Sequence, residues 1–295
     1  MTKEIVRLKP DCINCLLKNN LNRCPEGTDT KTRLEYMKRL MQIIVDADLD
    51  VSAPALNPAV HALQKEMFGM EPEDYTETKK YFNNLMMEKA VSIDKEIEAS
   101  PEPLKRALQY AMTGNYIDFG AMENVNEEDL EKLLTNAKNI PVDEQEYTAF
   151  LEDIKKAERI VYMTDNCGEV VMDKLLIQEI KRQNPEARIT VLVRGQEILN
   201  DATMRDAEQI GLTDMVPVIG NGSGIAGTFM KDISRESKEL MENADVLIAK
   251  GQGNFETLQL CGLNIYYLFL CKCEMFARRF QVPQFTGILV NEKNL

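Results

Sequence analysis

The stretch "MTDNCGEVVMDK", from Met163 to Lys174, brings Asp165, Asn166 and Glu169 together. The residues before it, "RIVYMTDN", have the apolar character of a buried strand, and those after it have that of a helix. Asp and Asn supply the oxygen ligands that a hard cation such as Mg²⁺ prefers. Glu169 is expected to be a third ligand, to orient the other two, or to act as a general base. Helix capping is the alternative, with Asp or Asn as the N-cap and Glu three residues later.

Polar residues also follow two further expected strands. After "RITVLVRG" comes "EILNDAT", in which Asp201 is either a second carboxylate for the same ion or the N-cap of the next helix. The strand "DVLIAKG" leads into "AKGQGNFET", where Lys250 is expected to meet a phosphate oxygen. Gly251 permits a tight turn there, and Asn254 lies beyond it. A solvated lysine on a plain turn is the alternative for this segment.

Two other segments suggest substrate contacts. In "IGNGSGIAGT", exposed backbone N–H groups near Ser223 and Gly227 are suited to cradling an anion, although a flexible surface loop explains the same pattern. The segment matches neither the Walker loop nor a dinucleotide fingerprint. In "TGNYIDFGAM", Asn115 and Asp118 stand among small and aromatic residues, as in a loop pressed against another surface, or in a simple helix-breaking turn.

The elements that position these residues change in kind along the chain. Residues 1–150 show the three- and four-residue apolar spacing of amphipathic helices. Residues 151–295 alternate short apolar strands with helices, which predicts an α/β fold with a mostly parallel, Rossmann-like sheet covered on both faces. In such sheets ligands bind beyond the carboxyl ends of the strands, where the polar residues described above collect.

Composition restricts the partners. The chain has 295 residues and a formal net charge of -13, which argues against broad binding to a nucleic-acid backbone. The first ten residues lack the apolar core of a signal peptide, and the most apolar run, "NIYYLFLC", is too short to span a bilayer. We therefore expect a cytoplasmic protein with no nucleic-acid or membrane partner. The sequence does not determine the oligomeric state.

Seven cysteines and one histidine complete the inventory of chemically active residues. An odd number of cysteines does not suggest a disulfide framework. Cys12 and Cys15 have CxxC spacing, and together with the remote Cys273 they are candidates for a thiolate site holding zinc or iron, with a redox pair or plain packing as alternatives. Cys167 is expected to be a bystander in the candidate oxygen site. The single histidine, His61, is expected to be structural.

Taken in order, six motifs resemble those of one family. They are "CINCLLKN", "TGNYIDFGAM", "TDNCGE", "LNDATMRDA", "NGSGIAGT" and "AKGQGNFE". The ordered set is similar to the family first catalogued as domain of unknown function eighty-nine, now called damage-control phosphatases, and to its stand-alone microbial branch. The resemblance implies a helical amino-terminal region packed on a Rossmann-like α/β/α domain. It also implies metal-dependent hydrolysis of phosphate monoesters of small metabolites, such as sugar phosphates or damaged phosphometabolites.

The resemblance implies roles for individual residues. Asp165, Asn166 and Asp201 would hold one Mg²⁺, Mn²⁺, Co²⁺ or Ni²⁺ ion, and Lys250 would hold the phosphate. Further substrate contacts are expected from the following residues: Asn115, Asp118, Ser223, Gly227, Gly251 and Asn254. Either Asp165 or a water molecule would attack phosphorus. The alternatives are an S-adenosylmethionine-dependent carboxyl methyltransferase and a metal- or nucleotide-binding protein without turnover.

Overall fold

The structure, a computed structural model, describes residues 7–118 and 125–295, and the chain divides into two units, residues 1–74 and 75–295. The first unit has a small apolar core of Tyr36, Leu40, Val60 and Leu63. The Tyr36 hydroxyl donates a hydrogen bond of 2.8 Å to Asn20 Oδ1 inside it. The elements of this unit are α1 (Pro10–Asn22), α2 (Thr30–Val45), η1 (Ala53–Leu56) and α3 (Asn57–Phe68).

The second unit begins with helices that belong to the same core as the sheet. They are α4 (Thr76–Glu98), α5 (Pro103–Gly114), α6 (Glu127–Asn136), η2 (Ala137–Asn139) and α7 (Glu144–Lys156). Their apolar faces pack in one cluster with strand residues such as Tyr162 and Val191. The first strand begins at Arg159, whereas the two units divide at residue 75, since α4 to α7 pack in the same core as the sheet.

A six-stranded sheet with the order β3-β2-β1-β4-β5-β6 forms the centre of this unit. The strands are β1 (Arg159–Met163), β2 (Arg188–Val193), β3 (Val218–Gly220), β4 (Val246–Lys250), β5 (Ile265–Leu270) and β6 (Gly287–Asn291). All neighbouring strands are parallel except β5 and β6, which are antiparallel. The mostly parallel sheet expected from the sequence is confirmed. Strand β6 was not among the strands that the sequence indicated.

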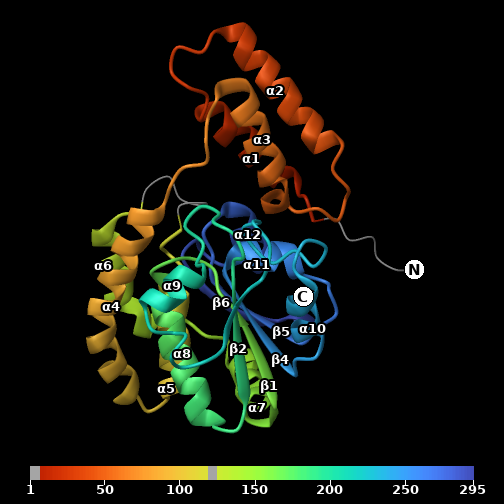
Figure 1. The fold of residues 1–295 in the computed structure, drawn as a ribbon. Helices are drawn as coiled ribbons and strands as arrows, with labels where there is room; N and C mark the ends of the chain where they lie inside the picture. Colours follow the sequence, from red (N-terminus) through yellow and green to blue (C-terminus); the bar gives the residue numbers. More distant parts are fainter. Residues whose placement is uncertain (1–6, 119–124) are drawn as a thin grey trace. The chain divides into compact units, whose positions relative to one another are not determined.

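Successive strand residues alternate between two apolar layers. Ile160 and Tyr162 of β1 face the layer that contains α4, α5 and α8 (Glu169–Gln183), whereas Val161 and Met163 face the opposite layer. Figure 1 shows the helices on either side of the sheet. The remaining elements are α9 (Met204–Gln209), α10 (Arg235–Glu242), α11 (Gly251–Leu258), α12 (Glu274–Phe280) and η3 (Glu292–Asn294). Helices α10 to α12 supply Met241, Phe255 and Phe276 to the second layer.

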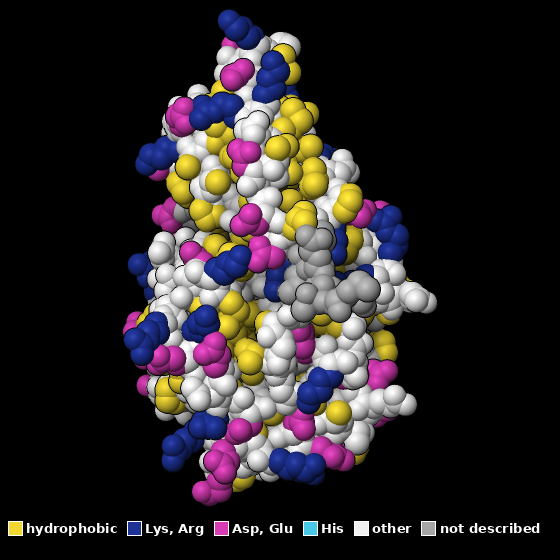
Figure 2. All heavy atoms as spheres, turned by 90° about the vertical axis from the view of Figure 1, so that its right-hand side faces the viewer, with side chains coloured by type: hydrophobic (Ala, Val, Ile, Leu, Met, Phe, Trp, Pro, Cys, Tyr) yellow, Lys and Arg dark blue, Asp and Glu magenta, His cyan; other side chains and the backbone are white. Residues whose placement is uncertain are grey.

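On the face that Figure 2 shows, hydrophobic side chains gather on the first unit, in the upper part of the view. Basic and acidic side chains are interspersed over the part of that face formed by residues 75–295. Among the described residues, every helix is too short or too polar to cross a bilayer.

Candidate active site

The candidate site lies where the strand order reverses, between β1 and β4. Strand β1 connects through α8 to β2 on one side, whereas β4 continues the sheet on the other side. Asp165 and Asn166 follow β1 after one intervening residue, Thr164, and Lys250 is the last residue of β4. A crevice at the carboxyl ends of strands that diverge in this way is the usual ligand site of open α/β sheets.

Two loops bring the expected metal ligands together. The backbone N–H of Ala202 donates to Asp165 O at 2.7 Å, and that of Cys167 donates to Asn200 O at 2.8 Å. Asn166 and Asp201 thereby form an isolated antiparallel bridge. Asp165, Asn166 and Asp201 are each at most 6% exposed. The loop after β2 therefore places Asp201 beside the residues that follow β1.

Neither helix end is capped by the side chain of Asp165, Asn166 or Asp201, although Glu169 Oε2 accepts from the backbone N–H of Asn166 at 3.3 Å. The N-cap of α8 is Gly168, with a φ of 69° and no side-chain cap, and Glu169 is the first helical residue. Helix α9 is capped by Thr203 and Asp206, which form a capping box. Asp201 is therefore not the cap of α9. The polar residues at both strand ends are left for another role.

A buried guanidinium, which the sequence analysis did not assign, joins the two acidic residues. Arg194 Nε donates to Asp201 Oδ2 at 2.7 Å, and its Nη2 lies 3.4 Å from Asp165 Oδ1. Only 2% of Arg194 is exposed. The sequence feature that could have identified Arg194 is its position as a charged residue at the end of the apolar strand "RITVLVRG". Arg194 fixes the orientation of both carboxylates.

The electrostatics of the site leave an excess of negative charge. Burial raises the pKa of Asp165 well above its usual value, and Glu169, Asp201 and Asp118 raise it further. Burial also raises the pKa of Asp201, to about 6, against the opposing effect of Arg194. Five carboxylates form ion pairs with three cations here, which leaves two negative charges when all are ionised. The carboxylates are those of Asp118, Asp165, Glu169, Asp173 and Asp201, and the cations are Arg194, Lys250 and Lys272. This donor set suits an added hard cation.

Lys250 is placed differently from the expectation. The side-chain alternation along β4 turns Lys250 toward the layer of Val246 and Ile248, that of α5 and α8. Its ammonium lies 2.6 Å from Glu169 Oε1, 2.6 Å from Asp173 Oδ1 and 2.9 Å from Ala111 O. An ammonium has three donors, so all of them are used. Lys250 acts in this structure as the counterion of two buried carboxylates.

Glu169 and Asp173 lie one turn apart on α8 and share Lys250. The second oxygen of Glu169 accepts from Asn115 Nδ2 at 2.8 Å. The Tyr162 hydroxyl donates to Asp173 Oδ1 at 2.8 Å. Burial raises the pKa of Asp173 to about 7 even though Lys250 lowers it, and the charge of Glu169 raises it. Asp173 was not assigned from the sequence. Its position four residues after Glu169, on the same face of the expected helix, could have identified it.

Asn115 lies inside the site rather than at its margin. Its Nδ2 donates to Asp165 Oδ2 at 3.1 Å as well as to Glu169, and its Oδ1 accepts from Leu270 N at 3.0 Å. Asn166 Nδ2 donates to the same Asp165 oxygen at 2.8 Å. The ends of α5 and β5 are thus tied to the residues after β1. This network fixes the Asp165 carboxylate in one orientation.

Asp118 forms an ion pair with Lys272, which is the second residue after β5. The Lys272 side chain is 1% exposed, and its charge lowers the pKa of Asp165. The sequence analysis did not assign Lys272, although a lysine two residues after the most apolar strand was a usable signal. Residues 119–122 of the segment "TGNYIDFGAM" lie outside the described residues.

The other expected substrate residues mainly build the two glycine-containing turns. Ser223 Oγ hydrogen-bonds Asp232 and accepts from Ile225 N at 3.1 Å. Asn254 donates to Thr164 O at 3.0 Å, and its Oδ1 accepts from Thr228 Oγ1 at 2.7 Å. At Gly227, with a φ of 119°, a Cβ would lie 2.6 Å from Gly253 O. The loop after β3 is therefore packed against the start of α11.

Gly251 sets the space available to Asp165. It has a φ of 78°, and a Cβ there would lie 1.8 Å from Asp165 Oδ2. We expect Gly251→Ala to lower kcat/KM for a phosphate ester at least about a hundredfold, because a displacement of about 1 Å in a catalytic group has that effect. Gly262→Ala is the matched control, since Gly262 has a φ of 81° with nothing within 4 Å of its Cβ. Equal kinetics for the two variants would contradict this account.

The cysteines divide between the units. Cys12 and Cys15 lie on α1 of the first unit, and Cys273 is the N-cap of α12 in the second. Burial raises the pKa of Cys167 far above that of a free thiol, which does not favour a nucleophilic role. Within residues 7–118 and 125–295, no three His, Cys, Asp or Glu side chains are arranged to hold a metal ion. The expected oxygen site is of another kind, because one of its three ligands is the Asn166 amide.

Known proteins resemble this chain in sequence and in fold over nearly its whole length. The family model of the damage-control phosphatase ARMT1-like domain matches residues 8–287. A damage-control phosphatase of Pyrococcus horikoshii is 32% identical over 297 residues, which cover 98% of this chain and 99% of the relative. One of Archaeoglobus fulgidus is 30% identical over 284 residues, covering 92% and 95%. The crystal structure of a DUF89 family protein from Pyrococcus horikoshii covers 97% of this chain and 99% of its own, with a TM-score of 0.74 and 27% identity.

Proposed function

This chain belongs to the damage-control phosphatase ARMT1-like domain family, and on that premise we propose that it is a metal-dependent phosphatase. Relatives named damage-control phosphatase support the phosphatase role. The proposed substrates are phosphate monoesters of small metabolites, such as sugar phosphates or damaged phosphometabolites. The proposed site is the buried group of Asp165, Asn166 and Asp201 at the switch point of the sheet.

One observation carries the metal part of the proposal. Asp165 and Asp201 come from different loops, are buried together, and have more negative charge around them than Arg194, Lys250 and Lys272 neutralise. Their carboxylates and the Asn166 amide would hold Mg²⁺, Mn²⁺, Co²⁺ or Ni²⁺. Such an ion polarises a phosphoryl oxygen and offsets the charge that develops during displacement at phosphorus.

We assign the phosphate contact to Lys272 instead of Lys250. All three donors of Lys250 are used by Glu169, Asp173 and Ala111, all deep in the core. Lys272 lies close enough to Asp165 to lower its pKa and is paired with Asp118. An oxygen of an incoming phosphate would accept a hydrogen bond from Lys272, which also stays paired with Asp118. Such a charge-assisted hydrogen bond is stronger than one between neutral groups. Asp118 would then be left near the non-phosphate part of the substrate.

The chemical roles follow from these contacts. Asn115 and Asn166 hold the Asp165 carboxylate by donating to its Oδ2. Glu169 accepts from both amides and is itself held by Lys250, so it orients the site. Either Asp165 attacks phosphorus, which leaves a phosphoenzyme, or a water molecule does so. The turn after β1 has one glycine, Gly168, which caps α8, and this does not favour the S-adenosylmethionine alternative.

Hydrolysis of an aryl phosphate tests the proposal. We expect activity with at least one of the four divalent ions and its loss with a chelator. Lys272→Met is expected to lower kcat/KM by roughly 10- to 100-fold, because hydrogen bonds to charged groups contribute about 1.5–3 kcal/mol. Lys156→Met, which alters a side chain that is 73% exposed, is the matched control. No hydrolysis with any ion would refute the phosphatase; full activity of Lys272→Met would refute its assigned role.

A further inference from the structure

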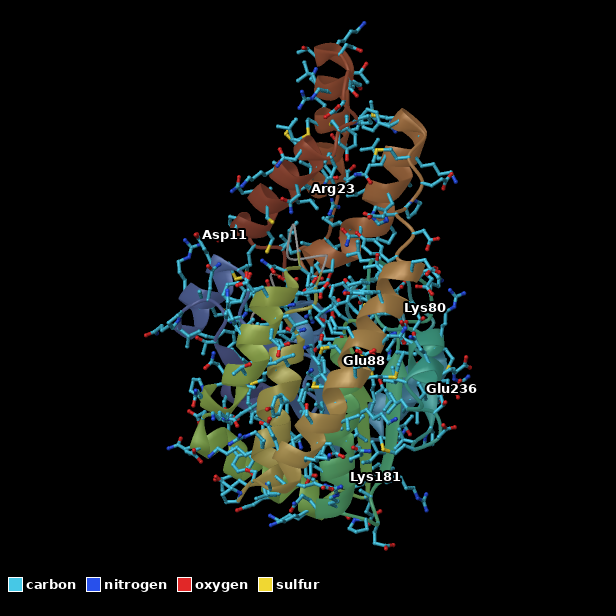
Figure 3. All side chains as sticks on the ribbon, turned by 90° about the vertical axis from the view of Figure 1, so that its left-hand side faces the viewer. Asp11, Arg23, Lys80, Glu88, Lys181 and Glu236 are labelled. Atoms are coloured by element: carbon cyan, nitrogen blue, oxygen red, sulfur yellow. The ribbon has the colours of Figure 1, made fainter. Side chains whose placement is uncertain are left out.

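Helix α4 carries two buried polar residues on one face. Lys79 and Asn83, four residues apart, are 3% and 0% exposed. Lys80 and Glu88 of the same helix, labelled in Figure 3, are exposed. Polar groups are rarely buried without hydrogen-bond partners. The partners of this pair lie on the two loops that carry the proposed metal ligands.

Asn83 contacts the residues that follow β1. Its Oδ1 accepts from the backbone N–H of Gly168 at 2.6 Å. Gly168 lies two residues after Asn166 and has a left-handed φ of 69°. A Cβ at Gly168 would lie 2.8 Å from Ile117 Cδ1, so the turn has little space to move. Without Asn83, a donor in this tight turn would lose its partner.

The other end of the Asn83 amide contacts the segment that follows β2. Its Nδ2 donates to Asp206 Oδ1 at 2.9 Å. The second oxygen of Asp206 accepts from Thr203 N at 2.8 Å and lies 2.8 Å from Lys79 Nζ. Thr203 stands two residues after Asp201. A closed ring of contacts therefore runs from Asn166 through Gly168, Asn83, Asp206 and Thr203 to Asp201, and back across the Asn166–Asp201 bridge.

We propose that Asn83 is a positioning residue that, together with Lys79 and Asp206, fixes the separation of the two ligand-bearing loops and so determines the affinity for the divalent cation. The inference rests on the proposed function, because it takes Asp165, Asn166 and Asp201 as the ligands. Backbone hydrogen bonds hold the two loops together near the ligands, and the Asn83 side chain holds them together on the side that faces α4. Loss of such an outer contact typically weakens metal binding by 10- to 100-fold.

Equilibrium binding of Mn²⁺, followed by electron paramagnetic resonance of the free ion, tests the inference without any substrate. We expect Asn83→Ala to raise the dissociation constant by roughly 10- to 100-fold. Asn83→Leu, which fills the space that alanine leaves empty, is expected to weaken binding similarly, because it too lacks the hydrogen bonds to Gly168 and Asp206. It decides the question if Asn83→Ala does not fold.

Asn184→Ala is the matched control. Asn184, the C-cap of α8, donates to Ile154 O at 2.9 Å and Ala157 O at 2.8 Å, so its loss affects stability at the far end of that helix. The Mn²⁺ affinity of Asn184→Ala is expected to stay within about twofold of wild type, whereas loss of a contact that supports the metal ligands changes the affinity at least about tenfold. A Mn²⁺ dissociation constant of Asn83→Leu equal to that of wild type would overturn this inference but not the proposed metal site. Failure of the wild type to bind Mn²⁺ better than Asp201→Ala would overturn the proposed metal site itself.

Discussion

Replacing Asp165 by alanine is expected to lower kcat for an aryl phosphate on the order of a thousandfold or more. The substitution removes a proposed metal ligand, which is also one of the two candidates for the nucleophile, together with the acceptor of the Asn115 and Asn166 amides. Metal stabilisation of a phosphoryl transition state contributes several kcal/mol, and each 1.36 kcal/mol corresponds to a tenfold change in rate. Steady-state kinetics at saturating metal ion measure the effect.

A matched carboxylate serves as the control for this variant. Asp153 accepts from the Tyr266 hydroxyl at 2.8 Å and lies outside the proposed site. Asp153→Ala is expected to keep kcat within a few fold while losing some stability. Undiminished activity of Asp165→Ala would show that the reaction occurs elsewhere. In the wild type, rapid-quench trapping of an acyl phosphate would identify Asp165 as the nucleophile, whereas its absence would favour water.

The second large effect concerns the folded state. Replacing Lys250 by methionine leaves Glu169 and Asp173 without their shared cation, and all three side chains are 0% exposed. Breaking a buried ion pair by removing one partner typically costs about 3–5 kcal/mol. We therefore expect Lys250→Met to lower the free energy of unfolding of the unit formed by residues 75–295 by an amount in this range. Urea denaturation followed by circular dichroism measures it.

The loss of unfolding free energy in Lys250→Met is expected to depend on pH. Without Lys250, the pKa of Asp173 rises further, because burial and the charge of Glu169 are no longer opposed by the lysine. The folded variant then binds more protons than its unfolded chain, so its stability falls as pH rises. The difference from wild type should be smaller at pH 5.5 than at pH 8. Lys156→Met is the control, since its exposed pair with Glu152 contributes at most about 1 kcal/mol. A deficit that grows on acidification would contradict the structural role of Lys250.

The sequence made the approach of Asp201 to Asp165 and Asn166 predictable. Parallel strands align their carboxyl ends at one edge of the sheet, so polar residues after successive strands are brought together whatever the side chains in between. The same argument placed Lys250 at that edge. It did not determine which way the lysine points, because that depends on the layer that its strand position faces.

The amino-acid sequence by itself determined the α/β class, the mostly parallel sheet and the edge at which the proposed site lies, since apolar periodicity and strand ends are local properties of the chain. Only the tertiary structure decided which cation meets which carboxylate. Arg194 reaches Asp165 and Asp201, Lys250 reaches Glu169 and Asp173, and Lys272 reaches Asp118. These pairs join residues up to 154 positions apart, and they form because each charge, once buried by packing, needs a partner close to it.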